Sequence, residues 1–353
     1  MSVELRGKGI YAWILERCEG GDMKAVASRL KSAGMTHVLP KIADGISTYT
    51  RNWLYLPALV DQCHKVGIKV IGWQYVYGTR PAAEADRAVA ELNRLPFDGF
   101  VINAEQEYRD LANNDQAAKI YCERIRASYP DILLGLSTYR YPHYHRRFPF
   151  TAFLTYCDVN MPQVYWMQAN GTVPRQLADT ITAYRLYPPK PIIPTGAAFA
   201  EHGWTAIPGD QGVFVDEVLK HGLSGCNWWE YYEAFHKNPQ LGQAIAAAQF
   251  APPEEETVLF RARCITTALN VRSGPGAGYE KVGLLRMGDE VDVYEVSDNN
   301  WYRLGAGLWC SGYEKYMERL PEPEPEPEPE PDPEQPELTL EERVERLEKA
   351  VFG

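Results

Sequence analysis

The chain has 353 residues and a formal net charge of −11, most of which lies near its C-terminus. Residues 321–353 contain twelve acidic and three basic residues, so they carry −9 and residues 1–320 carry only −2. A nearly neutral body lacks the clustered Lys and Arg that phosphate contacts need, which argues against a nucleic-acid partner. No apolar run approaches 18 residues, so the sequence predicts no transmembrane helix and no membrane partner.

Residues 1–250 alternate short apolar segments with helical ones. The segments expected to form strands are 9–15, 37–42, 69–76, 99–104, 132–138, 159–166, 191–199 and 225–230. The segments expected to form helices are 22–33, 53–66, 81–92, 114–128, 174–186 and 210–221. Eight strands alternating with helices indicate a (β/α)8 TIM barrel, an α/β fold. A doubly wound sheet is the alternative, but no Gly-rich phosphate turn follows the first strand.

Two acidic, proline-containing segments mark the ends of this domain and of the next one. Residues 251–256 are interpreted as a linker, and the Glu/Pro-rich residues 321–337 as an extended spacer. Residues 257–320 contain short strand-like segments broken by Gly, Pro and Asn, at 259–264, 269–272, 290–296, 301–304 and 308–310. This pattern predicts a small all-β barrel.

The motifs within residues 257–320 are specific enough to suggest a domain type. LNVRSGPG at 269–276 is followed by a tyrosine, a glycine, GDEV at 288–291 and WYRL at 301–304. The segment resembles a bacterial SH3 (SH3b) domain over nearly its whole length. This resemblance implies a module that binds peptidoglycan or another surface glycan. Cys264 and Cys310 either pair in an oxidising exterior or are two small core residues.

Residues 338–353 are predicted to form a short amphipathic helix. Thr339 and Glu342 have the spacing of a capping box, which satisfies backbone amides at a helix start. The apolar residues follow the 4-3-4 spacing of a coiled-coil seam: Leu340, Val344, Leu347 and Val351. The segment therefore predicts a homo-oligomer held through 338–353, and an amphipathic tail without a partner is the alternative.

The candidate active site lies where the predicted strands end, because TIM-barrel sites form at that face. Glu105 follows the fourth strand and is the candidate general acid, since desolvation by neighbouring aromatic rings would raise its pKa. Glu230 and Glu107 are candidates for the second carboxylate, and Glu230 is favoured because it approaches from another strand. The candidate substrate-binding residues are Lys41, Trp73, Tyr75, Gln163, Tyr165 and Trp229.

Three short motifs of the barrel resemble the glycoside-hydrolase superfamily. FVINAE at 100–105 resembles the Asp-x-Glu ending of strand 4 in lysozyme-like and chitinase-like barrels, and NMPQVY at 160–165 and NWWE at 227–230 support the resemblance. Asn103 stands where those families have an aspartate. The resemblance implies that Asn103 orients the substrate, but an amide supplies no negative charge. The enzyme therefore draws a second carboxylate from elsewhere or is impaired.

Together these features predict an endolysin-like hydrolase of a cell-wall glycan, most plausibly peptidoglycan, held on its substrate by the SH3b domain. The alternative is a catalytically impaired glycan-binding or structural barrel in a virion or surface assembly. His143 and His145 lack an evident third ligand, so we predict neither metal nor cofactor. Residues 1–10 lack the apolar stretch of a signal peptide. We therefore expect a phage- or prophage-type lysin, or a virion-associated protein, that acts at the cell wall or outside the cell.

Overall fold

The computed structural model describes residues 5–168, 171–201, 203–250, 258–304 and 308–321. The chain divides into two compact units, Met1–Glu255 and Glu256–Gly353. The linker predicted at 251–256 and the helix predicted at 338–353 lie outside the described residues. The two units are therefore taken one at a time.

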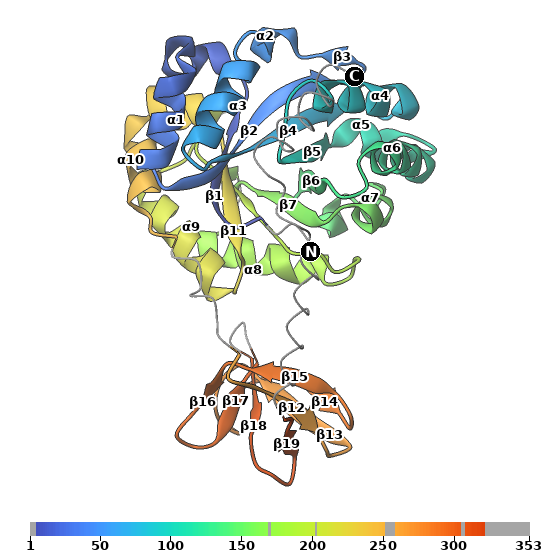
Figure 1. The fold of residues 1–353 in the computed structure, drawn as a ribbon, viewed down its shortest axis with the longest axis vertical. Helices are drawn as coiled ribbons and strands as arrows, with labels where there is room; N and C mark the ends of the chain where they lie inside the picture. The colour runs from blue at the N-terminus through green and yellow to red at the C-terminus, as the bar shows by residue number, and fades with distance from the viewer. Residues whose placement is uncertain (1–4, 169–170, 202, 251–257, 305–307, 322–353) are drawn as a thin grey trace, which may run out of the picture. The chain divides into compact units, whose positions relative to one another are not determined.

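Eight parallel strands form a closed barrel in the first unit (Figure 1). In barrel order they are β1 (Gly7–Ala12), β2 (Met35–Asp44), β4 (Lys69–Val76), β5 (Gly99–Ala104), β6 (Leu133–Tyr139), β7 (Val159–Val164), β8 (Thr195–Ala197) and β11 (Gly225–Trp229). The barrel closes because β1 pairs with β2 on one side and with β11 on the other. This confirms the predicted TIM barrel.

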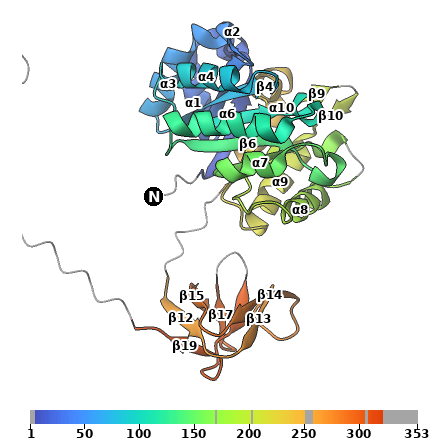
Figure 2. The same ribbon diagram turned by 90° about the vertical axis from the view of Figure 1, so that its right-hand side faces the viewer.

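Helices surround the barrel: α6 packs beside α7, and α8 packs beside α9 (Figure 2). The longer helices are α1 (Met23–Ser32), α3 (Leu56–Lys65), α4 (Pro81–Leu92), α6 (Asn114–Ser128), α7 (Phe150–Tyr156), α8 (Val173–Tyr184), α9 (Pro208–Lys220) and α10 (Pro239–Ala247). The short elements are η1 (Leu15–Gly21), β3 (Ser47–Thr48), α2 (Thr50–Trp53), α5 (Gln106–Asp110), η2 (Pro142–Tyr144), η3 (Trp166–Gln168), β9 (Ala200–Glu201), β10 (Trp204–Thr205) and η4 (Glu233–Lys237).

Most predicted elements agree with the structure, and the differences have local causes. The strands predicted at 69–76 and 99–104 and the helices predicted at 81–92 and 114–128 have the observed bounds. The strand predicted at 191–199 is only Thr195–Ala197, because Pro191 and Pro194 have no backbone N–H for a regular ladder. Helix α7 was not predicted, since its seven residues are too few to display a helical period.

Side chains that point into the barrel form a core of their own, separate from the core under the helices. Neighbouring strands contribute alternate residues to it, such as Ile71 and Trp73 from β4 and Val159 and Met161 from β7. At Gly9 the backbone of β1 approaches a neighbouring ring so closely that a Cβ atom would lie 2.0 Å from His37 Nε2. Glycine at this position therefore makes room for a buried histidine.

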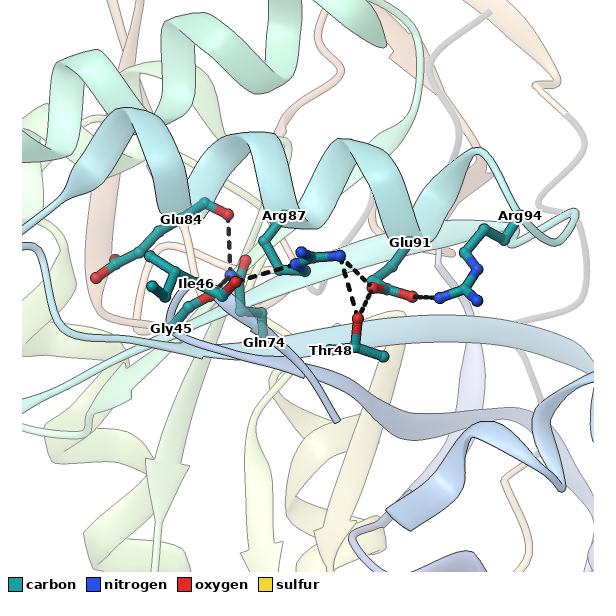
Figure 3. A network of polar contacts seen from close by, with 8 residues as sticks. All are labelled: Gly45, Ile46, Thr48, Gln74, Glu84, Arg87, Glu91 and Arg94. Atoms are coloured by element: carbon teal, nitrogen blue, oxygen red, sulfur yellow. Dashed lines mark hydrogen bonds and ion pairs between the residues drawn. The ribbon is translucent and has the colours of Figure 1, made fainter. Parts of the chain in front are cut away.

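A polar network joins α4 to the hairpin formed by β2 and β3 (Figure 3). Arg87 Nε donates to the backbone oxygen of Ile46, and Arg87 Nη1 donates to Glu91 Oε1 at 3.1 Å. Glu91 is 1% exposed and also accepts hydrogen bonds from Thr48 and Arg94. The network therefore holds this hairpin against the outer layer of the barrel.

The second unit is a small all-β barrel, as predicted. Its strands are β12 (Phe260–Cys264), β13 (Ala268–Arg272), β14 (Lys281–Arg286), β15 (Glu290–Val293), β16 (Glu295–Val296), β17 (Trp301–Arg303), β18 (Trp309–Ser311) and β19 (Met317–Arg319). They form two antiparallel sheets, with the orders β15-β12-β19 and β14-β13-β18-β17-β16. Cys264 and Cys310 are buried, free thiols in the core of this unit, which agrees with the second of the two expectations for them.

Candidate active site

A pocket of about 800 Å³ opens where the barrel strands end. Eight predicted site residues line it: Lys41, Trp73, Tyr75, Asn103, Glu105, Gln163, Tyr165 and Trp229. The other lining residues are Tyr11, Trp13, Ser137, Tyr139, Arg140, Tyr141, Tyr144, His145, Arg175, Gln176, Asp179, Phe199 and Glu201. The strand-end rule thus brings together residues that lie far apart in the sequence.

Glu105 directly follows β5 and is half-buried in this pocket. Its Oε1 accepts a hydrogen bond from Gln163 Nε2 at 2.8 Å. Burial raises the pKa of the Glu105 carboxyl, and the charge of Glu107 adds to this effect, whereas the amide donors Gln163 and Asn103 oppose it. Because burial is the largest cause, the pKa is raised overall, as a general acid requires.

Asn103 is buried at the end of β5, on the same side of the strand as Glu105. With its amide nitrogen turned toward the pocket, Asn103 donates to Glu105 Oε1 and to the backbone oxygen of Ser137, both at 3.2 Å. This orientation satisfies two oxygen acceptors at once. Asn103 therefore acts on Glu105 as a neutral donor, which favours the ionised carboxylate, while an aspartate there would repel it.

Aromatic rings form the floor of the pocket. Trp229 is the centre of the group, with its ring centroid 5.5 Å from Tyr11, 5.6 Å from Trp73 and 6.2 Å from Trp13. Trp13 is 42% exposed, whereas Trp73 is 2% exposed. Flat apolar surfaces of this kind suit the apolar faces of sugar rings, and Trp13 and Trp229 are the most accessible of them.

Lys41 is held rigidly beside this floor. Its Nζ lies 2.6 Å from Asp44 Oδ2 and within 4.9 Å of the centroids of the Tyr49 and Trp73 rings. Tyr75 is 5.9 Å from the same ammonium group. An ammonium group among aromatic faces is stabilised by cation–π attraction, so Lys41 presents a fixed donor to whatever enters the pocket.

The two carboxylates expected to assist Glu105 do not line the pocket. Glu107 accepts a hydrogen bond from Tyr75 Oη at 2.6 Å. Glu230 is 6% exposed, and its carboxylate accepts from the backbone amides of Tyr232 and Glu233, at 3.2 and 2.9 Å. The expectation that Glu230 faces Glu105 is therefore not met, because the carboxylate satisfies amide groups of the turn that follows its own strand.

Two other carboxylates, which the sequence did not single out for the site, line the pocket. Asp179 lies on α8, where its Oδ2 is 3.6 Å from Arg175 Nε, and Glu201 lies in the short strand β9. The strand-end rule could not find Asp179 because it comes from a helix. Glu201 follows the strand predicted at 191–199, but no motif in the sequence distinguishes it from other surface carboxylates.

The histidines near the pocket rim contact aromatic rings. His145 stacks on Tyr139 with ring centroids 3.5 Å apart, and His143 contacts Tyr144 at 4.2 Å. Among the residues that the structure describes, no group of three or more His, Cys, Asp or Glu side chains is arranged to hold a metal ion.

Within the same described ranges, no helix is long and apolar enough to cross a membrane.

Comparison with known proteins gives a family for the second unit and a fold for the first. Residues 267–315 match the family model of the bacterial SH3 domain. No curated protein sequence is significantly similar to the chain. The barrel is similar to the chitinase of Bacteroides thetaiotaomicron, with a TM-score of 0.56 and 12% identity over 69% of this chain and 96% of that one.

Two further chitinase structures have the same architecture. The class V chitinase of Nicotiana tobaccum has a TM-score of 0.53 and 11% identity, and the GH18 chitinase of Pseudoalteromonas aurantia has a TM-score of 0.51 and 14% identity. In both cases 69% of this chain covers 100% of the other. At such identities the shared property is the fold. The chain thus joins a TIM barrel, whose fold these chitinases share, to a bacterial SH3 domain.

Proposed function

We propose that the barrel hydrolyses glycosidic bonds in a cell-wall amino-sugar polymer, peptidoglycan, and that the SH3 domain binds the same wall. The observation that carries this proposal is Glu105, a half-buried carboxyl with a raised pKa in a pocket floored by aromatic rings. A carboxyl with a raised pKa keeps its proton to higher pH than a free glutamate does, and it can give that proton to a glycosidic oxygen. The protein would act at the cell wall or outside the cell, as a phage- or prophage-type lysin or a virion-associated protein.

The second group of the reaction would come from the substrate itself. In substrate-assisted glycosidases a single protein acid suffices, because the acetamido oxygen of the sugar attacks the anomeric carbon. The bond to the leaving oxygen breaks as that oxygen takes the Glu105 proton. A water molecule then attacks the anomeric carbon of the cyclic intermediate, and the Glu105 carboxylate accepts a proton from that water. Asn103 and Tyr165, which line the pocket, would orient the acetamido group.

The SH3 domain would raise the concentration of the barrel at an insoluble substrate without adding any contact in the pocket. Residues 257–320 contain eight basic and eight acidic residues, so this module is neutral and does not repel an anionic wall. Binding to the wall would then depend on specific contacts and not on net charge.

A second candidate function is a glycan-binding or structural barrel without catalysis. The observation that favours it is Asn103, which places an amide where related hydrolases have an aspartate. Residues 338–353 would then multimerise the protein in a virion or surface assembly. The mass in solution with and without residues 321–353 tests that part, because an unchanged monomer would eliminate it.

Purified cell walls test the proposed hydrolase directly. The wild-type protein should release fragments with new reducing ends, detected by mass spectrometry, and Glu105→Gln should abolish this release. Glu123→Gln is the matched control, because Glu123 lies exposed on α6, outside the pocket, and should keep wild-type release. If wild-type protein binds walls but releases nothing, the binding function replaces the hydrolase.

A further inference from the structure

Three cations line the pocket, and two of them have a carboxylate partner. Lys41 Nζ is 2.6 Å from Asp44, and Arg175 Nε is 3.6 Å from Asp179. Arg140, which directly follows β6, forms no ion pair with any carboxylate in the described parts of the chain. Its guanidinium therefore gives the pocket wall a positive charge that neighbouring side chains leave uncompensated.

The contacts of Arg140 leave most of its donors available. The residue is half-buried, and its Nη1 donates to the backbone oxygen of Tyr165. Its guanidinium carbon lies 5.1 Å from the centroid of the Tyr141 ring, within the range of a cation–π contact. A guanidinium has five N–H donors and remains charged when buried. A partly buried charge of this kind is normally paired, and here the partner can come from the ligand.

Arg140 belongs to the same part of the pocket as the candidate acid. The residue that receives its hydrogen bond, Tyr165, is two positions beyond Gln163, which donates to Glu105. Strands β5 and β6 are neighbours, so Glu105 and Arg140 follow adjacent strand ends. A polymer bound with a glycosidic oxygen at Glu105 would therefore pass along the wall that carries Arg140.

We propose that Arg140 binds a carboxylate of the glycan, so that the pocket selects an acidic amino-sugar polymer over a neutral one. This inference rests on the proposed function, because it requires a glycan in the pocket. A planar guanidinium recognises a carboxylate through two parallel hydrogen bonds. In peptidoglycan the lactyl group of every second sugar supplies this carboxylate where the stem peptide has been removed, whereas in other amino-sugar polymers the carboxylate belongs to a uronic acid.

Binding of three tetrasaccharides tests the proposal in a Glu105→Gln background, which prevents turnover. The probes are a neutral chitin tetrasaccharide, a peptide-free peptidoglycan tetrasaccharide and a hyaluronan tetrasaccharide, measured by calorimetry. Arg140→Gln should weaken peptidoglycan binding by about tenfold to a hundredfold, as expected for loss of a charged hydrogen-bond pair, and leave chitin binding unchanged. Arg185→Gln, which removes an exposed arginine outside the pocket, should change neither.

The remaining outcomes separate the possible failures. If Arg140→Gln weakens the binding of acidic and neutral probes equally, the proposal is overturned. Arg140 would then have only a structural role, through its hydrogen bond to Tyr165 after β7. Arg140→Lys keeps the positive charge but loses the two parallel donors of the guanidinium. If Arg140→Gln fails to fold, a partly retained preference of Arg140→Lys for acidic over neutral probes would support carboxylate recognition. Preference for hyaluronan would assign the carboxylate to a uronic acid. Absence of hydrolysis by the wild type would overturn the proposed function but not the binding preference.

Discussion

Gln163 donates a hydrogen bond from Nε2 to Glu105 Oε1 at 2.8 Å, which joins the end of β7 to the residue that follows β5. The bond favours the ionised carboxylate, whereas burial favours the protonated acid. The pKa of Glu105 therefore depends on two opposed effects, each of which can be changed by substitution. The protonation state that catalysis needs is set by neutral neighbours and not by a second carboxylate in contact with the acid.

Removing this donor should extend activity to higher pH. In Gln163→Leu the ionised form of Glu105 loses its hydrogen bond, so the pKa rises and the acid stays protonated longer as pH increases. We expect the basic limb of the pH profile of kcat/KM to move up by about one unit. Wall-fragment release between pH 5 and 9 measures the shift. Gln62→Leu, at a half-buried site on α3 outside the pocket, is the control, and an unmoved limb in Gln163→Leu would contradict the assignment.

Asn103→Asp should place a second carboxyl beside Glu105, where the structure has an amide. The new carboxylate would lie near Glu105 Oε1, because the amide nitrogen of Asn103 is 3.2 Å from it. Two carboxyls at that separation share a proton, which raises the pKa of the acid. We expect hydrolysis of cell walls to increase by about tenfold, since a carboxylate also stabilises developing positive charge. A loss of activity in Asn103→Asp would instead show that the amide itself is required. Asn103→Ser, which is neutral but smaller, separates the effect of charge from the effect of side-chain size.

Much of the barrel could be predicted because its strands and helices have strong periodicity. β5 is buried on both faces and is apolar except for Asn103, which predicts a strand over 99–104. α4 begins at a proline, which marks the start of the helix in the sequence. Glu105 and Gln163 were found because both occur at strand ends. The same rule could not reveal which way the Glu230 side chain turns, since that depends on the amides of the turn that follows it.

Arg140 illustrates a different limit. The sequence places Arg140 after β6, beside two tyrosines. Whether its charge is available to a ligand depends on which side chains contact it in the folded protein. Arg175 lines the same pocket and is paired with Asp179 one helical turn away, a pairing that i,i+4 spacing predicts. In the described ranges Arg140 makes no corresponding ion pair. The sequence could not reveal this, because the carboxylates of the pocket come from distant segments of the chain.

His37 should make the stability of the protein depend on pH. The ring is fully buried, and its Nε2 is 2.6 Å from Asn227 Oδ1. Burial, and then the charge of Lys69, lower the pKa of His37 to about 4, while the hydrogen bond with Asn227 opposes the shift. The unfolded chain, with a His pKa near about 6.5, therefore binds more protons than the folded chain between these values.

The free energy of unfolding should consequently fall as pH is lowered from about 6.5 to 4, by roughly 3 kcal/mol from this residue alone, and be flat above that window. Urea unfolding at several pH values measures the slope. His37→Gln should be less stable at pH 7 but lose most of the slope. His64→Gln, at a surface site beside Asp98, should retain it. Equal slopes in the wild type and His37→Gln would contradict a buried neutral histidine.

A buried and an exposed carboxylate on α4 allow a comparison of how burial changes the contribution of an ion pair to the free energy of unfolding. Glu91 is 1% exposed and binds Arg87, Arg94 and Thr48, as Figure 3 shows. Asp86, on the same helix, pairs with Arg124 in a contact whose side chains are both about half exposed. Substituting Glu91 removes a buried carboxylate that three partly buried donors share, whereas water replaces the partner of an exposed arginine.

We therefore expect Glu91→Gln to lower the free energy of unfolding by about 2 to 3 kcal/mol and Asp86→Asn by less than about 1 kcal/mol. Urea unfolding of both variants at 0.05 and 0.5 M NaCl measures this. Salt should reduce the small effect of Asp86→Asn proportionally more, because the Glu91 carboxylate is buried and both partners of the Asp86 pair are exposed. Similar losses in the two variants would mean that the α4 network does not hold the β2–β3 hairpin. Loss of that hairpin should also loosen Asp44, which pairs with Lys41 in the pocket, so Glu91→Gln should weaken glycan binding while Asp86→Asn leaves it unchanged.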